Sequence, residues 1–212
     1  MKKIVLLLIL PLLFSCGNPY DGETIVNLNL KIVDANSQPI PNVKANIGAG
    51  DNAFEVYDYE IYKKTSNFDG IINFDMFMPV NSATLYIDNS ITYLPVTISG
   101  LSDTTFSSLN WDIGTIMLFK QEEIIPFNIT INQITATKTI TNIEIVGDHY
   151  QNEIKLGSEI YENNELQTYF LLKKNQNFIL KYELVNSITN LTETIEENLS
   201  ISDTEYNYTL TF

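Results

Sequence analysis

The chain contains no arginine, a single cysteine and a single histidine among its 212 residues. Arginine is the favoured residue for bidentate contacts with phosphates and bases, and a basic face marks nucleic-acid binding. The net charge of −14 makes this chain acidic, which disfavours contact with a negatively charged nucleic acid. These features exclude nucleic acid as a partner, and the lone Cys16 rules out a disulfide within the chain.

The scarcity of histidine and cysteine also limits chemistry. Zinc sites need three or four His, Cys or acidic ligands, and hydrolytic triads usually need a histidine base. His149 lies in the polar stretch 147–150 and is expected to be a solvated loop residue. We therefore predict no catalytic residue, no metal site and no cofactor, and hence no enzyme. Carboxylate pairs for glycoside hydrolysis and a calcium site remain alternatives, because acidic residues are plentiful.

The N-terminus has the pattern of a secretory signal: Met1-Lys2-Lys3 is cationic, the run Ile4–Phe14 is apolar, and Ser15 is a small residue before Cys16. The run is shorter than the roughly 20 apolar residues that span a bilayer. The segment 13–16, Leu-Phe-Ser-Cys, resembles the lipobox of bacterial lipoproteins, although Phe14 is bulkier than usual. Cleavage after residue 15 and lipidation of Cys16 are what this resemblance implies.

Lipidation would explain the unpaired cysteine of an exported chain, and acyl chains contribute about 0.8 kcal/mol per buried CH₂ to membrane binding. Residues 16–23 are predicted to form a lipidated tether, in which Asp21 and Glu23 are similar to export signals of Bacteroidetes surface lipoproteins. That resemblance implies an outer-membrane protein with its membrane contact through Cys16, at the cell surface or on the periplasmic face. Loss of Lys2 and Lys3 would leave 10 lysines against 26 acidic residues.

Alternating apolar residues predict an all-β fold. Val26, Leu28 and Leu30 fall on one face of a strand, and Ile72, Phe74 and Met76 do the same after the turn signal Asp69-Gly70. Short strands separated by turns of this kind are typical of β-sandwiches. With 44% hydrophobic residues the chain can bury a full core.

Three stretches, 33–45, 65–74 and 112–118, together resemble the carboxypeptidase regulatory-like family. The resemblance covers residues 24–120 and implies a transthyretin-like, seven-stranded sandwich that is usually a non-catalytic appendage. Six further strands are predicted between residues 121 and 212, which form a second β-sandwich without a recognised family. The expected architecture is thus two consecutive Ig-like or transthyretin-like sandwiches after a cleaved signal peptide.

Aromatic residues are the remaining candidates for recognition. Trp111, Tyr57, Tyr59 and Tyr62 could mark a sugar or protein contact surface, whereas packing at a sandwich end is the alternative for Trp111. The final strand, Tyr206–Phe212, either closes its own sheet or offers an edge to a partner chain. Two functions follow: a lipid-anchored module that binds an envelope protein or glycan, or a structural, pilus-like subunit that acts by β-strand pairing.

Overall fold

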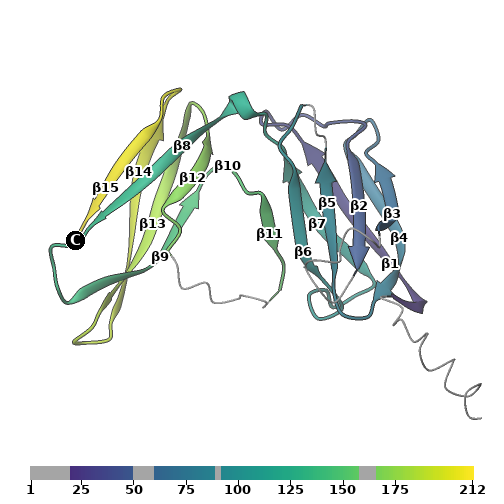
Figure 1. Cartoon of the computed structure of the whole chain (residues 1–212), viewed down its shortest axis with the longest axis horizontal. Coiled ribbons are helices and arrows are strands. Elements are labelled where there is room, and N and C mark those ends of the chain that lie inside the picture. The colour runs from purple at the N-terminus through teal and green to yellow at the C-terminus, as the bar shows by residue number, and fades with distance from the viewer. Residues whose placement is uncertain (1–19, 50–59, 89–91, 158–165) are drawn as a thin grey trace, which may run out of the picture.

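The computed structural model describes residues 20–49, 60–88, 92–157 and 166–212. These segments form two β-sandwiches that are joined at one end by a single 3-10 turn, η3 (Gln121–Glu123) (Figure 1). The predicted all-β architecture of two consecutive sandwiches is confirmed. Across the described ranges, no helix has the length and apolar character needed to span a membrane.

The first sandwich packs a three-stranded sheet of order β4-β1-β7 against a sheet of order β11-β6-β5-β2-β3. Its own strands are β1 (Tyr20–Val33), β2 (Lys44–Ala49), β3 (Glu60–Thr65), β4 (Ile71–Pro79), β5 (Ala83–Asp88), β6 (Val96–Leu101) and β7 (Asn110–Met117). The fifth strand of the larger sheet, β11 (Glu153–Lys155), comes from the C-terminal half of the chain.

The second sandwich packs a sheet of order β10-β12-β8-β15 against a sheet of order β14-β13-β9. Its strands are β8 (Ile124–Asn132), β9 (Lys138–Val146), β10 (His149–Tyr150), β12 (Tyr169–Lys173), β13 (Gln176–Asn186), β14 (Thr192–Ile201) and β15 (Tyr206–Thr211). The first and last strands of this half, β8 and β15, run parallel and side by side.

Apolar residues at alternate positions of a strand are buried together, because successive side chains of a strand point to opposite faces of the sheet. In β1, Val26, Leu28 and Leu30 are at most 2% exposed, while Asn27 and Asn29 lie on the outer face. Each sandwich therefore has its own core, one built around the inner faces of β1, β4 and β5 and the other around those of β8, β13 and β15. Two separate cores are what two consecutive sandwiches require.

The first strand begins earlier than the sequence suggests. Tyr20 pairs with Pro79 across β4, and the register shifts between Tyr20 and Ile25. The Asp21 carboxylate accepts backbone hydrogen bonds from Glu23 (3.1 Å) and Thr24 (3.2 Å). Residues 20–23, predicted as part of the tether, thus belong to an irregular start of β1: Tyr20 pairs with β4, and the Asp21 carboxylate holds the turn that follows.

Candidate functional site

The aromatic candidates lie inside the first sandwich or outside the described residues. Trp111 is 0% exposed and stacks on Phe106 at 5.1 Å between ring centroids. Its indole Nε1 has no hydrogen-bond partner among the residues described. A side chain without exposed surface contributes to packing rather than to surface contact, so Trp111 belongs to the core. The segment 50–59, with Tyr57 and Tyr59, lies outside the described residues, as does Cys16.

Tyr62 lies at the edge of the sandwich where β3 faces β4. Its ring meets that of Tyr20 edge-on, with centroids 5.5 Å apart. Its hydroxyl accepts a hydrogen bond of 3.0 Å from the backbone N–H of Phe77. Burial, together with the nearby Tyr62, raises the pKa of Tyr20 to about 12. The Tyr62 hydroxyl therefore takes up a backbone N–H at the outer edge of β4, and its ring closes this side of the sandwich.

His149 fixes a local turn. Its Nδ1 lies 2.9 Å from the carbonyl oxygen of Gly147, and its Nε2 lies 2.6 Å from the side-chain nitrogen of Gln151. The imidazole therefore uses both of its ring nitrogens for contacts within this turn. Within the ranges that the structure describes, no group of three or more His, Cys, Asp or Glu side chains could hold a metal ion.

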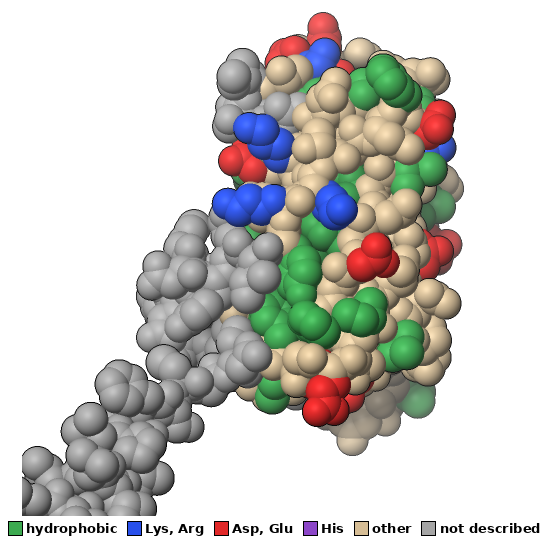
Figure 2. Space-filling model, turned by 90° about the vertical axis from the view of Figure 1, so that its right-hand side faces the viewer, with side chains coloured by type: hydrophobic (Ala, Val, Ile, Leu, Met, Phe, Trp, Pro, Cys, Tyr) green, Lys and Arg blue, Asp and Glu red, His purple; other side chains and the backbone are tan. Residues whose placement is uncertain are grey.

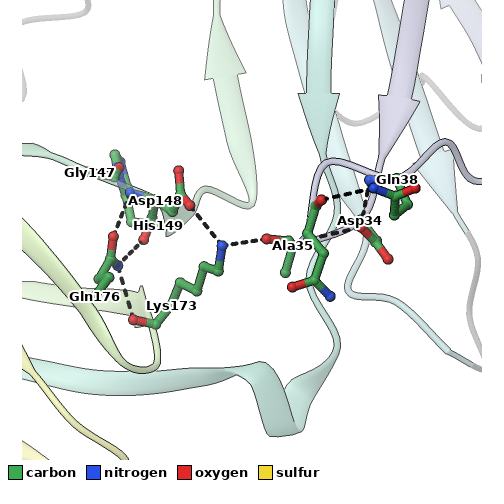
Figure 3. Close-up of polar contacts among 9 residues, drawn as sticks. Asp34, Ala35, Gln38, Gly147, Asp148, His149, Lys173 and Gln176 are labelled. Carbon is green, nitrogen blue, oxygen red and sulfur yellow. Dashed lines mark hydrogen bonds and ion pairs between the residues drawn. The ribbon is translucent and has the colours of Figure 1, made fainter.

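The two sandwiches meet through Lys173, at the end of β12 (Figure 3). Its Nζ donates to the carbonyl oxygen of Ala35 in the first sandwich and forms an ion pair of 3.0 Å with Asp148. Gln176 holds Asp148 in place: its Oε1 accepts from the Asp148 N–H (2.9 Å), and its Nε2 donates to the Asp148 carbonyl (2.5 Å). Because only 27% of the Lys173 side chain is exposed, this polar contact is partly shielded from water.

A small apolar cluster surrounds the same junction. Ala35, Phe119 and Ile124 are each at most 5% exposed and pack together, with Tyr150 against them. The Tyr150 hydroxyl donates to the carbonyl oxygen of Pro95 at 2.7 Å. The junction therefore combines apolar burial with directed hydrogen bonds between the two sandwiches.

Beyond Tyr150, the chain crosses to the first sandwich, and residues 152–156, here called the arm, pair in parallel with β6 (Figure 1). Thr97 donates its N–H to the carbonyl of Asn152, and Leu156 donates to that of Ser99, both at 2.9 Å. Gly100 has a φ of +80°, and a β-carbon there would collide with the Leu156 carbonyl oxygen. A main-chain ladder and close backbone approach thus attach the arm to β6.

A second polar cluster lies where the two sheets of the second sandwich meet at their edges. Glu197 of β14 accepts hydrogen bonds from Tyr182 of β13 (2.9 Å) and from Tyr208 of β15. Burial, the hydrogen bond to Glu197 and its charge raise the pKa of Tyr182 to about 12, and the same causes raise that of Tyr208 further. One carboxylate thereby links the edges of both sheets.

Two exposed apolar features lie at opposite ends of the first sandwich. Phe68, at the tip of the turn before β4, is 90% exposed. At the end where β1 begins and β4 ends, Ile25 and Phe77 face each other across the ladder and are 50% and 37% exposed.

On the side with β3 and β4, Figure 2 shows lysines gathered over one half and hydrophobic side chains next to them.

The arm, the Lys173 junction and the Glu197 cluster were not predicted from the sequence. Each joins segments that are far apart in the chain, such as Ala35 and Lys173, and no short motif announces such a contact. The one local signal is Gly100, since a glycine inside a strand often marks the close approach of another backbone.

No protein-family model matches this chain, and no curated protein matches it. Among solved structures, it is similar to the major pilin SpaD of Corynebacterium diphtheriae at 10% identity and a TM-score of 0.34, over 85% of this chain and 66% of the pilin. The shaft pilin SpaA of Lactobacillus rhamnosus GG matches at 8% identity and a TM-score of 0.33, over 89% of this chain and 98% of that one.

A 3-chlorocatechol 1,2-dioxygenase of Rhodococcus opacus matches over 49% of this chain and 66% of its own length, at 13% identity and a TM-score of 0.35. The chain spans 34% of the Bacillus anthracis TIE protein, which it also resembles. Pilin subunits thus recur among these structures, but scores of this size transfer no function.

Proposed function

We propose that this chain is a non-catalytic structural protein of the bacterial cell envelope, anchored by lipid on Cys16 and assembled through β-strand pairing. The observation that carries the proposal is the pairing of the arm with β6. An edge strand of one sandwich accepts a strand that leaves the other sandwich, with Ile154 and Leu156 packed against the core that receives them.

Strand addition of this kind relies on main-chain hydrogen bonds and is a general mode of association between β-proteins. The chain already uses it to join its own two halves. The Lys173 contact and the apolar cluster around Phe119 then restrain the angle between the sandwiches. A subunit with a restrained shape suits a structural role, because an assembly built from repeated contacts needs a constant geometry.

The anchor part of the proposal rests on the sequence and on the position of Tyr20. Four residue steps separate Cys16 from Tyr20, and a fully extended chain covers at most about 3.6 Å per residue. A lipid on Cys16 would therefore keep the start of β1 within about 14 Å of the membrane. The exposed pair Ile25 and Phe77 lies at this end, where apolar side chains could contact lipid.

Metabolic labelling with a fatty-acid probe tests the anchor. We expect label on the wild-type chain and none on Cys16→Ala, with Ser15→Ala as a matched control that keeps a small residue before the cysteine. An unlabelled wild-type chain would overturn the anchor. If the chain is labelled, cleavage by a protease added to intact cells would place it on the outer face of the outer membrane. Protection from the protease would place it on the periplasmic face.

Amine cross-linking of the full chain in intact cells tests assembly. Without the leader the chain would keep 10 of its 12 lysines, so contacts on many surfaces should be captured. We expect a ladder of cross-linked species that contain this chain. Monomer alone at every cross-linker concentration would contradict a structural role and favour a module that binds its partner weakly.

A specific observation supports binding of an envelope protein or glycan as a second function. Phe68 is 90% exposed, yet its turn is well defined: the Asn67 side chain accepts hydrogen bonds from Asp69 and Ile71, both at 2.9 Å. A rigid turn loses little entropy when its aromatic ring meets a ligand. Loss of an envelope partner in Phe68→Ala but not in Ile188→Ala, a control at a second exposed site, would favour this function.

A further inference from the structure

The edge formed by β15 differs from the other strand edges of the molecule. In the sheet of order β10-β12-β8-β15, β15 is the end strand, and its register with β8 runs without interruption from Tyr206 to Thr211. Among the described residues it pairs with β8 alone. Figure 1 places it on the side of the second sandwich that faces away from the first.

The hydrogen-bond pattern shows which backbone groups this edge presents. Phe212 donates its N–H to Asn132, and its carbonyl accepts from Ile134, so both of its groups are directed toward β8. In a parallel pair, alternate residues direct both groups to the same neighbour. The peptide groups of Asn207, Thr209 and Thr211 therefore point outward, as a row of donors and acceptors ready for another strand.

The other edges carry features that discourage pairing. Charged side chains, irregularities and short strands are the usual protections of an edge. The β4 edge is capped by Tyr62, and the β7 edge has a register shift at Gly114. The remaining edge strands carry charges or are short, as shown by Lys63 and Lys64 in β3, Glu193 and Glu196 in β14, Lys138 and Glu144 in β9, the two-residue β10 and the three-residue β11.

We propose that β15 pairs antiparallel with β15 of a second copy of this chain, so that two four-stranded sheets become one. This inference deepens the proposed structural function and depends on it for the setting in the envelope. Two copies related by a twofold axis present the same strand in opposite directions, which is the arrangement of an antiparallel pair.

Charge opposes a second copy less at this edge than on the charged surfaces of the chain. The chain carries a net charge of −14, so most of its surfaces repel a second copy. β15 has no charged residue, and its outward side chains are those of Asn207, Thr209 and Thr211. Threonine pairs are favourable across antiparallel strands. Self-pairing here brings no like charges opposite each other within the strand.

Cysteine cross-linking in intact cells tests the pairing on the full chain. Directly opposed residues of antiparallel strands have Cα atoms about 4.5–5.5 Å apart, within the range of a disulfide. Cysteines at 207, 209 and 211, singly and as the pairs 207/209 and 209/211, cover the registers that place these side chains opposite one another. After mild oxidation we expect a reducible dimer for at least one of them.

Matched controls are Asn198→Cys and Ser200→Cys, which are exposed on β14 in the other sheet. Dimer formation at these positions equal to that at β15 would overturn the proposal, as would no dimer for any β15 variant. If lysine cross-linking shows assembly while β15 cysteines give no dimer, the chain assembles through another surface and only this inference fails. If fatty-acid labelling fails while the β15 dimer persists, the anchor fails and the pairing stands.

A proline substitution provides a second, independent test. Thr209→Pro removes an outward N–H and leaves the hydrogen bonds to β8 in place, whereas Thr209→Ser keeps the N–H. In sedimentation of the full chain in detergent, we expect Thr209→Pro to weaken self-association by more than about tenfold and Thr209→Ser to preserve it. Equal association of the two variants, with both folded by circular dichroism, would overturn the proposal.

Discussion

Gly100 is the residue on which the attachment of the arm depends most directly. Its φ of +80° favours glycine, and a β-carbon would collide with the Leu156 carbonyl. Gly114 has a similar φ of +83°, but a β-carbon at that position would have nothing within 4 Å. Alanine substitutions at the two glycines can therefore be compared: both carry the free-energy cost of the backbone conformation, and only the one at Gly100 also carries the cost of displacing the arm.

We predict that Gly100→Ala lowers the free energy of unfolding by about 1–3 kcal/mol more than Gly114→Ala does. Both variants should share the strain of a positive φ, and only the first should displace Leu156. Urea unfolding measures the difference, and hydrogen exchange at the Leu156 amide should speed up in Gly100→Ala alone. Equal destabilisation would mean that the arm contributes little to stability.

Glu197 is a second residue with a specific prediction, because its two carboxylate oxygens accept from two tyrosines. Glutamine has one acceptor oxygen in its amide, so Glu197→Gln leaves one hydroxyl without its acceptor. We expect a loss of about 1–3 kcal/mol in urea unfolding at pH 7. Glu196→Gln, on the exposed face of the same strand, should change stability by less than about 0.5 kcal/mol.

The raised tyrosine pKa values also predict a loss of stability in alkali. In the unfolded chain, tyrosine titrates near pH 10, whereas the pKa of Tyr182 in the folded protein is about 12. The unfolded state therefore loses its protons first. Stability should be fully present below about pH 10 and decrease as the pH rises toward 12. Burial still raises both pKa values in Glu197→Gln, but the hydrogen bond to the carboxylate and its charge no longer add to it, so the decrease should be shallower. An equally steep decrease would contradict this assignment.

At the level of strands and sheets, β12 carries the contact that couples the two sandwiches. Lys173→Met keeps an apolar stem of similar length but removes the bonds to Ala35 and Asp148. We expect wild-type calorimetry to show one transition and Lys173→Met to show two, because each sandwich has its own core. Lys174→Met is the matched control, since the backbone of Lys174, rather than its side chain, donates to Glu123. Two transitions in the control as well would indicate that the coupling lies elsewhere.

Strand alternation was predicted well from sequence because it follows from local geometry. Ile72, Phe74 and Met76 were expected on one face of a strand and are at most 1% exposed. The short strands β10 and β11 were not predicted. Two or three residues are too few to show a period, and β11 exists only because β6 provides its partner.

For the molecule as a whole, charge should govern self-association. Without the leader the chain would have a larger excess of acidic residues than the full sequence, whose net charge is −14. Salt shortens the Debye length from about 10 Å at 0.1 M to about 3 Å at 1 M, which screens repulsion between copies. We predict that the β15 dimer is strengthened by added salt in sedimentation experiments. Weakening by salt would indicate contacts between opposite charges instead.

Residue order alone was enough to predict most of the longer strands and the turns between many of them, because these depend on neighbours a few positions apart. The acidic character of the chain follows from its composition. Packing in three dimensions was needed to bury Trp111, to bring Lys173 to Ala35 and to leave β15 at an edge. These outcomes depend on which strands become neighbours. That choice is made by the fit of whole sheets and cores, to which residues more than a hundred positions apart contribute together.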